Sequence, residues 1–225
     1  MDENKIARNT TALLCFTAGF CDTLTFVAAG ELFSAHVTGN FIVFAFNMVK
    51  HTGSDGWRKL LSFPVFVLAA VAGAWIGRRS AVKYRLLHLE ALFLLIAGLS
   101  SFLLPPQSSE TGWPVLIVAM TIVVAMGFQN TFGRLHNKAV WGSTTVMTGN
   151  VTQAVLDMVS GVTTRNATET WSSFRKHLTI IVAFLCGCLA AAVMDIGFGL
   201  SAVLFPCTMI TIWSIYLNRT NTSSS

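Results

Sequence analysis

The sequence predicts an all-α integral membrane protein with six transmembrane helices and two short re-entrant or half-spanning helices, arranged as two inverted three-span repeats. Composition, the apolar stretches and a duplicated motif lead to this prediction. Hydrophobic residues make up 53% of the 225 residues and charged residues only 11%, and the mean hydropathy is +0.63. Because soluble domains carry roughly 25% charged residues, we exclude a soluble fold and expect a lipid bilayer around the chain.

Six apolar stretches are each long enough to cross a bilayer, which takes about 20 helical residues. They cover residues 11–30, 60–77, 86–104, 113–132, 178–194 and 199–217. Since short polar segments separate them, residues 1–225 are expected to form a single membrane domain that ends in a polar tail, 218–225.

The triplet Thr-Gly-Asn occurs twice, at residues 38–40 and 148–150, and each copy precedes a short hydrophobic run. Related segments precede both copies, because Gly-Phe-Cys-Asp-Thr at 19–23 corresponds to Gly-Phe-Gln-Asn-Thr at 127–131. We therefore predict two internal repeats, about 9–104 and 113–217. Interrupted hydrophobic segments at equivalent positions of two repeats are a sequence pointer to a transport site.

The segments that follow the triplets are too short to cross alone. Residues 38–49 and 148–159 number twelve each, so a helix over either rises only about 18 Å against a hydrocarbon core of about 30 Å. Two topologies are open. If 33–49 and 140–159 do cross, the chain has eight spans and parallel halves; if they re-enter, it has six spans and inverted halves.

The distribution of basic residues favours six spans, because short cytoplasmic loops are enriched in Lys and Arg. In the six-span arrangement, 12 of the 15 basic residues lie on the cytoplasmic side, including the cluster between residues 78 and 85, and only Lys50, Arg58 and Lys59 lie outside. Both termini are then cytoplasmic. This topology also explains the net charge of +5, so nucleic acid is not an expected partner.

Asp22 is the candidate for proton coupling. It is the only charged residue between Arg8 and Glu31, and it lies about 21 Å along a helix from Arg8. An ionisable side chain at that depth is a functional hypothesis by default. The alternative is structural, with Asp22 bonding the broken backbone of its own repeat. His36 is a second titrating candidate, or else a buried histidine with satisfied hydrogen bonds.

The half-helix starts are the candidate solute site. Non-helical backbone at membrane depth, expected at 31–37 and 139–147, must be buried in protein or line a wet cavity, and free N–H groups at a helix start favour an anion or a dipolar acceptor. The predicted substrate-binding residues are Thr38, Gly39, Asn40, Gln129, Asn130, Thr148, Gly149 and Asn150. His88 and Glu90 are expected at the cytoplasmic edge of their span.

No catalytic motif is present, since the chain has no GxSxG elbow, no HExxH and no Gly-rich phosphate loop. An enzyme is therefore not expected. The five cysteines lie in hydrophobic segments without paired CxxC or Cys/His spacing. We interpret them as apolar packing residues and expect no metal and no cofactor.

At residues 18–22, 33–40, 127–130 and 148–150, the chain resembles the YoaK-like family of small bacterial membrane proteins, over nearly its whole length. The family pattern has an acid at Asp22, the two triplets, and the amides Gln129 and Asn130, all of which this sequence keeps. The resemblance implies a multi-pass protein of the bacterial inner membrane. It supplies no substrate, since this is a family of uncharacterised function.

The leading hypothesis is a transporter or facilitator for a small polar or anionic solute, coupled to protons through Asp22. A channel-like facilitator is a variant of it, because paired re-entrant half-helices also build pores. The alternative of a different class is a non-transporting membrane scaffold or sensor whose triplets only brace the broken segments. An intramembrane enzyme ranks third, and a homo-oligomer is compatible with the sequence.

Overall fold

The computed structural model describes residues 3–50, 56–80, 82–104, 112–137, 139–163 and 167–222, and within these ranges the regular structure is entirely helical. The all-α prediction is therefore confirmed. The elements are α1 (Glu3–Ala28), α2 (Gly39–Lys50), η1 (Gly56–Leu61), α3 (Ser62–Arg79), α4 (Arg85–Ser101), α5 (Trp113–Leu135), α6 (Met147–Thr163), α7 (Ala167–Phe198), η2 (Gly199–Val203) and α8 (Leu204–Thr222).

Four of the described stretches are both long and apolar enough to cross a membrane. They are Glu3–Ala28, Gly56–Arg79, Trp113–Leu135 and Thr168–Thr220, the last of which runs through α7, η2 and α8. The helical structure and these four apolar stretches identify the chain as an integral membrane protein. Residues 218–222 of the polar tail belong to α8, and 223–225 lie outside the described residues.

Glycines in the left-handed region end two of the long helices. After α1, Gly30 has φ 64°, and the N–H of Glu31 returns to the carbonyl of Phe26 at 2.8 Å. After α7, Gly199 has φ 51°. Glycine adopts this conformation without the steric penalty of a Cβ, so the chain leaves α1 into a non-helical segment and turns from α7 towards α8.

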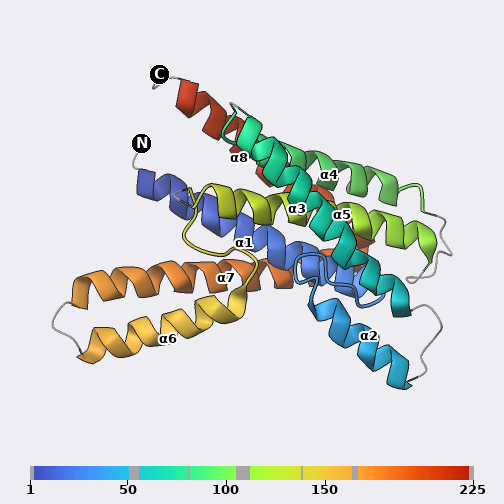
Figure 1. Cartoon of the computed structure of the whole chain (residues 1–225), viewed down its shortest axis with the longest axis horizontal. Helices are drawn as coiled ribbons and strands as arrows, with labels where there is room; N and C mark the ends of the chain where they lie inside the picture. The colour runs from blue at the N-terminus through green and yellow to red at the C-terminus, as the bar shows by residue number, and fades with distance from the viewer. Residues whose placement is uncertain are drawn as a thin grey trace.

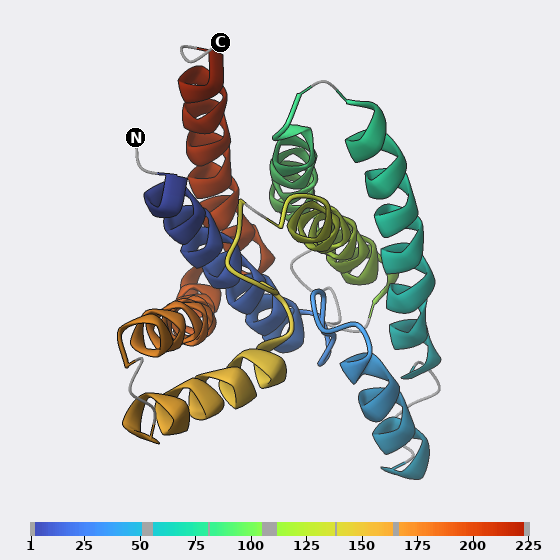
Figure 2. The same cartoon turned by 60° about the vertical axis from the view of Figure 1, so that its left-hand side comes forward.

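The long helices form a bundle in which α1, α4 and α7 run one way and α3, α5 and α8 run the other (Figure 1). Helix α1 packs along α7, α3 packs along α5, and α4 contacts both α5 and α8. The start of α1 and the end of α8 lie at the same end of the bundle in both views (Figures 1 and 2).

The two helices that follow the triplets, α2 with 12 residues and α6 with 17, diverge from this bundle. Helix α2 leaves it on one side, and α6 leaves it on the other as a hairpin with α7 (Figure 2). Asn40 is the buried residue of α2, whereas Ile42 and Val49 are 75% and 78% exposed. The outer surface of α2 is thus apolar, as a lipid-facing surface is. Non-helical segments precede both helices, the first connector (29–38) and the second connector (139–146).

Glycines allow the closest helix contacts in the bundle. A Cβ on Gly19 of α1 would lie 2.2 Å from the carbonyl oxygen of Phe184, and one on Gly187 of α7 would lie 2.0 Å from that of Phe16. The backbones of α1 and α7 therefore touch, as small residues permit in membrane helices. Between α3 and α5 the corresponding glycines, Gly73 and Gly127, are also in close contact with the facing helix.

Candidate functional site

Asp22 of α1 holds the first connector in place. Its side chain is buried, and Oδ1 accepts hydrogen bonds from the N–H groups of Ala35 (2.5 Å) and His36 (3.3 Å) and from the hydroxyl of Ser34 (3.4 Å). Oδ2 pairs with Nδ1 of the His36 ring. Four contacts from one carboxyl group thus fix three consecutive residues of non-helical backbone against α1.

The pair opens into a cavity of about 420 Å³. Besides Asp22 and His36, its lining includes Gly39 and the aromatic rings of Phe26, Phe33 and Phe184. The His36 side chain is 35% exposed and the Asp22 side chain 5%, and the imidazole meets Phe184 edge-on with ring centroids 5.7 Å apart. The histidine therefore connects a buried carboxyl group with a space that small molecules can enter.

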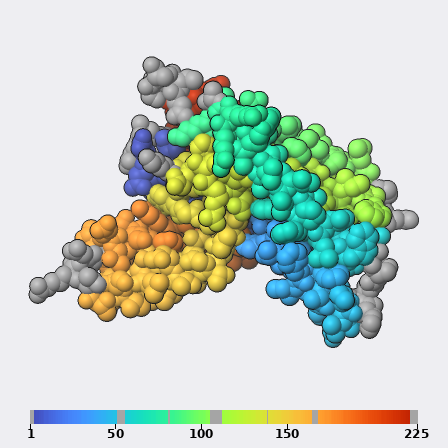
Figure 3. Space-filling model, viewed as in Figure 1, coloured from blue at the N-terminus to red at the C-terminus, as the bar shows by residue number. Residues whose placement is uncertain are grey.

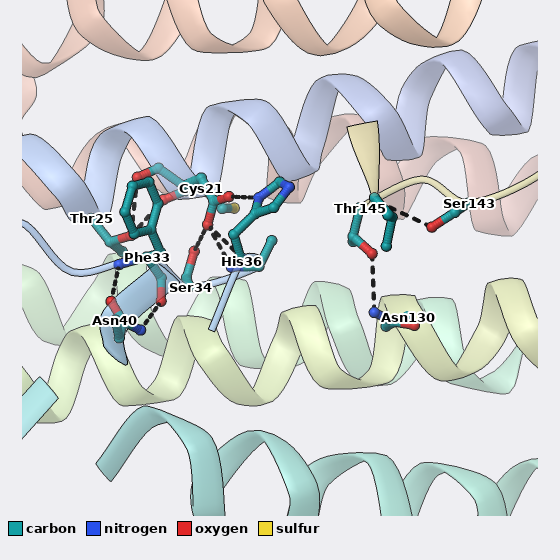
Figure 4. Close-up of polar contacts among 12 residues, drawn as sticks. Cys21, Thr25, Phe33, Ser34, His36, Asn40, Asn130, Ser143 and Thr145 are labelled. Carbon is teal, nitrogen blue, oxygen red and sulfur yellow. Dashed lines mark hydrogen bonds and ion pairs between the residues drawn. The ribbon is translucent and has the colours of Figure 1, made fainter. Parts of the chain in front are cut away.

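The amides of α5 hold the second connector in the corresponding way. Asn130 Nδ2 donates to Thr145 Oγ1 at 3.0 Å. Gln129 Nε2 donates to Thr144 Oγ1 at 3.2 Å and to the carbonyl of Leu14 at 3.0 Å, which ties α5 to α1. Gln129 is fully buried, and its Oε1 has no hydrogen-bond partner among the described residues. Both polar clusters lie between α1 and α5 (Figure 4).

A second cavity of about 230 Å³ adjoins this cluster. Asn130, Arg134, Asn137, Ser143, Thr144 and Thr145 supply its polar lining. It differs from the first cavity in charge, because it carries a guanidinium, and none of the described residues that line it is acidic. A small polar or anionic molecule fits this set of donors, since Arg and amide groups are directional donors to oxyanions.

The asparagines of the two triplets make equivalent contacts. Asn40 Nδ2 donates to the carbonyl of Phe33, and Asn150 Nδ2 donates to the carbonyl of Ser143, each seven residues back and each at 2.8 Å. Asn40 Oδ1 also accepts the N–H of Phe33 at 2.8 Å, and its Nδ2 donates to Ser62 Oγ at 2.7 Å. Both amides thus satisfy polar groups of the connector backbone.

The remaining triplet residues are divided between the first cavity and the surface. Gly39 lines the first cavity, whereas Thr38, Thr148 and Gly149 are exposed and line neither cavity. The N–H groups at the start of α2 are partly occupied, because those of Gly39, Asn40 and Phe41 each reach a carbonyl three residues back. Of the predicted residues, Asp22, His36, Gly39 and Asn130 line the cavities.

Replacing Asn40 by alanine is expected to lower the melting temperature of the purified protein in detergent. The change leaves the N–H and carbonyl of Phe33 unpaired, which costs about 1–3 kcal/mol and roughly 3–9 °C for a chain of this length. Asn150→Ala, which removes fewer bonds, should have a smaller effect, and Thr148→Ala is the matched control. Equal melting temperatures for all three variants would contradict the bracing role of the asparagines.

Three features of the site are not apparent from the motifs. Arg134 lies one helical turn after Asn130, and that spacing is the signal that could have found it. Phe184 and Cys188 of α7 line the first cavity because α7 packs against α1. No local sequence pattern predicts this contact between helices. Outside the two cavities, Glu90 is fully buried, and neither carboxyl oxygen has a partner among the described residues.

Glu90 is buried because α4 packs against both α5 and α8. Its position near the cytoplasmic edge of the span stays a prediction. The close contact continues at the next residue, where Cys207 Sγ of α8 donates to the carbonyl of Ala91 at 3.2 Å. Within the described ranges, no group of three or more His, Cys, Asp and Glu side chains is arranged to hold a metal ion.

Comparisons with known proteins place this architecture in a family. A family model described as "Protein of unknown function (DUF1275)" matches residues 10–216. The chain is also 26% identical over 198 residues to the UPF0700 transmembrane protein YoaK of Bacillus subtilis (strain 168), an alignment that covers 84% of each protein. No solved structure matches it. The chain therefore belongs to the DUF1275 family of membrane proteins, and the resemblance to YoaK-like proteins is confirmed.

Proposed function

We propose that this protein is a membrane transporter or facilitator for a small polar or anionic solute, coupled to protons through Asp22. The observation that carries the proposal is the pair of cavities, one beside each connector, within an apolar bundle. Polar groups inside a membrane are costly and mark solute or proton pathways. One cavity offers an acid and a histidine, and the other offers amides, hydroxyls and a guanidinium.

The second cavity is the proposed solute site. Asn130 and Arg134 extend from α5, and Thr144 and Thr145 face them from the second connector. Its volume of about 230 Å³ suits a solute of a few heavy atoms. Gln129, the neighbour of Asn130 in the chain, does not line this cavity; its bond to Thr144 supports a role in positioning the second connector.

The Asp22–His36 pair is the proposed proton carrier. The ionised carboxylate suits the three donors around Oδ1, because N–H and O–H groups bond an anionic oxygen more strongly than a neutral one. A proton on Asp22 weakens these bonds and loosens residues 34–36. Protonation and the position of the first connector are thus linked, which is the coupling that a proton-driven cycle needs.

The directions of the helices support two inverted three-span repeats. Helices α1 and α5, α3 and α7, and α4 and α8 occupy equivalent places in the two halves and run in opposite directions in Figure 1. The packing follows the same relation. The first helix of each half packs on the middle helix, since α1 packs on α7 of the other half and α5 packs on α3. Helix α2, with 12 residues, spans only about 18 Å, which supports a re-entrant segment. Helix α6 is longer than the twelve residues expected from the sequence, since its 17 residues span about 26 Å.

The six-span topology is testable with a reporter fused after Thr163, at the end of α6. Alkaline phosphatase, which is active only outside the cytoplasm, should be inactive there, whereas a fluorescent protein should be bright. A fusion after Lys50 is the control and should show the opposite pattern in both topologies. An active phosphatase after Thr163 would instead support eight spans and parallel halves.

A non-transporting scaffold or sensor is the second candidate. It is favoured by the side chains of Asn40 and Asn150, which bond connector backbone instead of facing a cavity. In that case the connectors are braced loops, and the Asp22 contacts have the same purpose. The scaffold differs from the transporter in one measurable respect, because it moves no solute.

The transporter proposal is tested with purified protein and a panel of amino acids, small carboxylates, phosphates and polyols. A compound that binds should raise the melting temperature of the protein. The same compound should enter vesicles that contain the protein faster than it enters vesicles without protein. Asn130→Ala with Arg134→Gln should reduce that uptake at least tenfold, and Arg78→Gln, which leaves both cavities intact, should not. Binding without uptake would support the sensor instead.

A further inference from the structure

A third cavity, of about 670 Å³, lies between the start of α1, the second connector and the first half of α7. Its charged lining consists of Arg8 from α1 and of Arg175 and Lys176 from α7, and none of the described lining residues is acidic. The three segments meet on one face of the molecule, seen as blue, yellow and orange atoms in Figure 3. This cavity shares no described lining residue with the two connector cavities.

One face of α7 is turned to this cavity. Thr168, Trp171, Ser172, Arg175 and Thr179 line it, and their spacing of three or four residues places them on one side of the helix. The opposite face bonds α6, because Ser173 Oγ and His177 Nδ1 contact Asp157 Oδ2 at 2.7 and 3.0 Å. The Asp157 carboxylate is thus engaged away from the cavity and does not offset its positive charge.

Two tryptophans complete the cavity. The backbone N–H of Trp141 donates to Thr11 Oγ1 at 2.8 Å, which fixes this residue against α1, and Lys176 Nζ lies 5.7 Å from the centre of its ring. Arg175 and Lys176 lie three and two residues before Leu178, where an apolar run starts. Tryptophan and basic residues at such a boundary are typical of the headgroup layer of a bilayer.

We propose that this cavity binds a phosphate-bearing anion, carried either by an anionic lipid headgroup or by a free phosphorylated molecule. The guanidinium of Arg175 presents a planar fork that matches two phosphate oxygens. Lys176 and Arg8 add further positive charge to the lining of the cavity. Ser172 and Thr168 supply hydroxyl groups from the same face. Basic pockets between membrane helices bind phosphate headgroups by this combination.

The test measures melting temperatures of the full chain purified in a neutral detergent. Three probes are added separately at equal ionic strength: phosphatidylglycerol, phosphatidylcholine and inorganic phosphate. We expect phosphatidylglycerol or inorganic phosphate to raise the melting temperature by roughly 5 °C, and phosphatidylcholine to have little effect. A shift with phosphatidylglycerol alone assigns the site to a lipid headgroup, and a shift with inorganic phosphate, alone or together with phosphatidylglycerol, assigns it to the phosphate group itself.

Two variants separate the cavity from general surface charge. Arg175→Gln with Lys176→Gln should remove at least half of the shift, whereas Arg78→Gln with Arg79→Gln, which removes the same charge outside the cavity, should keep it. Arg8→Gln, at an exposed position of α1, gives a second readout if the α7 variant does not fold. The proposal is overturned if neither anion shifts wild type, or if cavity and control variants lose the shift equally.

Discussion

Replacing Gly187 by alanine should strongly destabilise the protein, and Gly19→Ala should do the same. A Cβ at either position would lie within 2.2 Å of a carbonyl oxygen on the facing helix, so α1 and α7 must separate along their length. Overpacking of this kind costs about 3 kcal/mol, which corresponds to a melting temperature lower by roughly 6–12 °C. The measurement is thermal unfolding of detergent-purified protein, together with its yield in membranes.

Gly197→Ala is the matched control for Gly187→Ala, because it lies in the same helix and a Cβ there would meet nothing within 4 Å. We expect it to be neutral or slightly stabilising, since alanine favours a helix over glycine. Gly73→Ala should have an intermediate effect, because its nearest contact is a Phe128 ring atom at 3.1 Å. A wild-type melting temperature for Gly187→Ala would contradict the close α1–α7 packing.

Asp22→Asn should abolish the dependence of solute uptake on a proton gradient. An amide has a similar shape to the carboxyl group and does not take up a proton. Its oxygen can still accept from the N–H groups of residues 35 and 36, but its NH₂ group replaces the oxygen that pairs with His36, so the first connector should be held less firmly. Uptake of a bound solute is measured in proteoliposomes with and without an inwardly directed proton gradient, and only wild type should respond to the gradient.

Asp157→Asn is the control for this change. Asp157 is also a buried aspartate that pairs with a histidine, His177, and it lines neither connector cavity. The same chemical substitution there should leave proton dependence intact. If Asp22→Asn keeps its response, Asp22 is not the coupling group; if it fails to fold while Asp157→Asn folds, the structural interpretation of Asp22 gains support.

Hydropathy identifies the long helices of this fold because the bilayer imposes their length. The stretch 113–132 lies within α5, and the stretch 60–77 overlaps α3. The interruptions are equally visible, since the polar and small residues at 31–37 and 139–147 coincide with the two connectors. Backbone polar groups in a bilayer find hydrogen-bond partners only within the protein. Long helices and their interruptions therefore require different residue types, and both can be recognised in the sequence.

The faces of the helices are much harder to predict. In a soluble protein, alternating polarity tells the inward face from the outward one, but lipid and protein core are both apolar. For this reason the burial of Glu90 and the approach of Phe184 to the first cavity were not predictable from local pattern. The contacts of Asn40 and Asn150 depend on connectors that fold back over seven residues, which no helical or strand period encodes.

The most direct test of the account is the movement of protons by wild-type protein itself. Proteoliposomes that enclose a pH-sensitive dye are mixed with a solute that raises the melting temperature of the purified protein. We expect internal pH to change when the solute is added, and to stay constant in empty vesicles and in vesicles that carry Asp22→Asn. Solute entry with no change of internal pH in wild type would contradict proton coupling, and no entry at all would contradict transport.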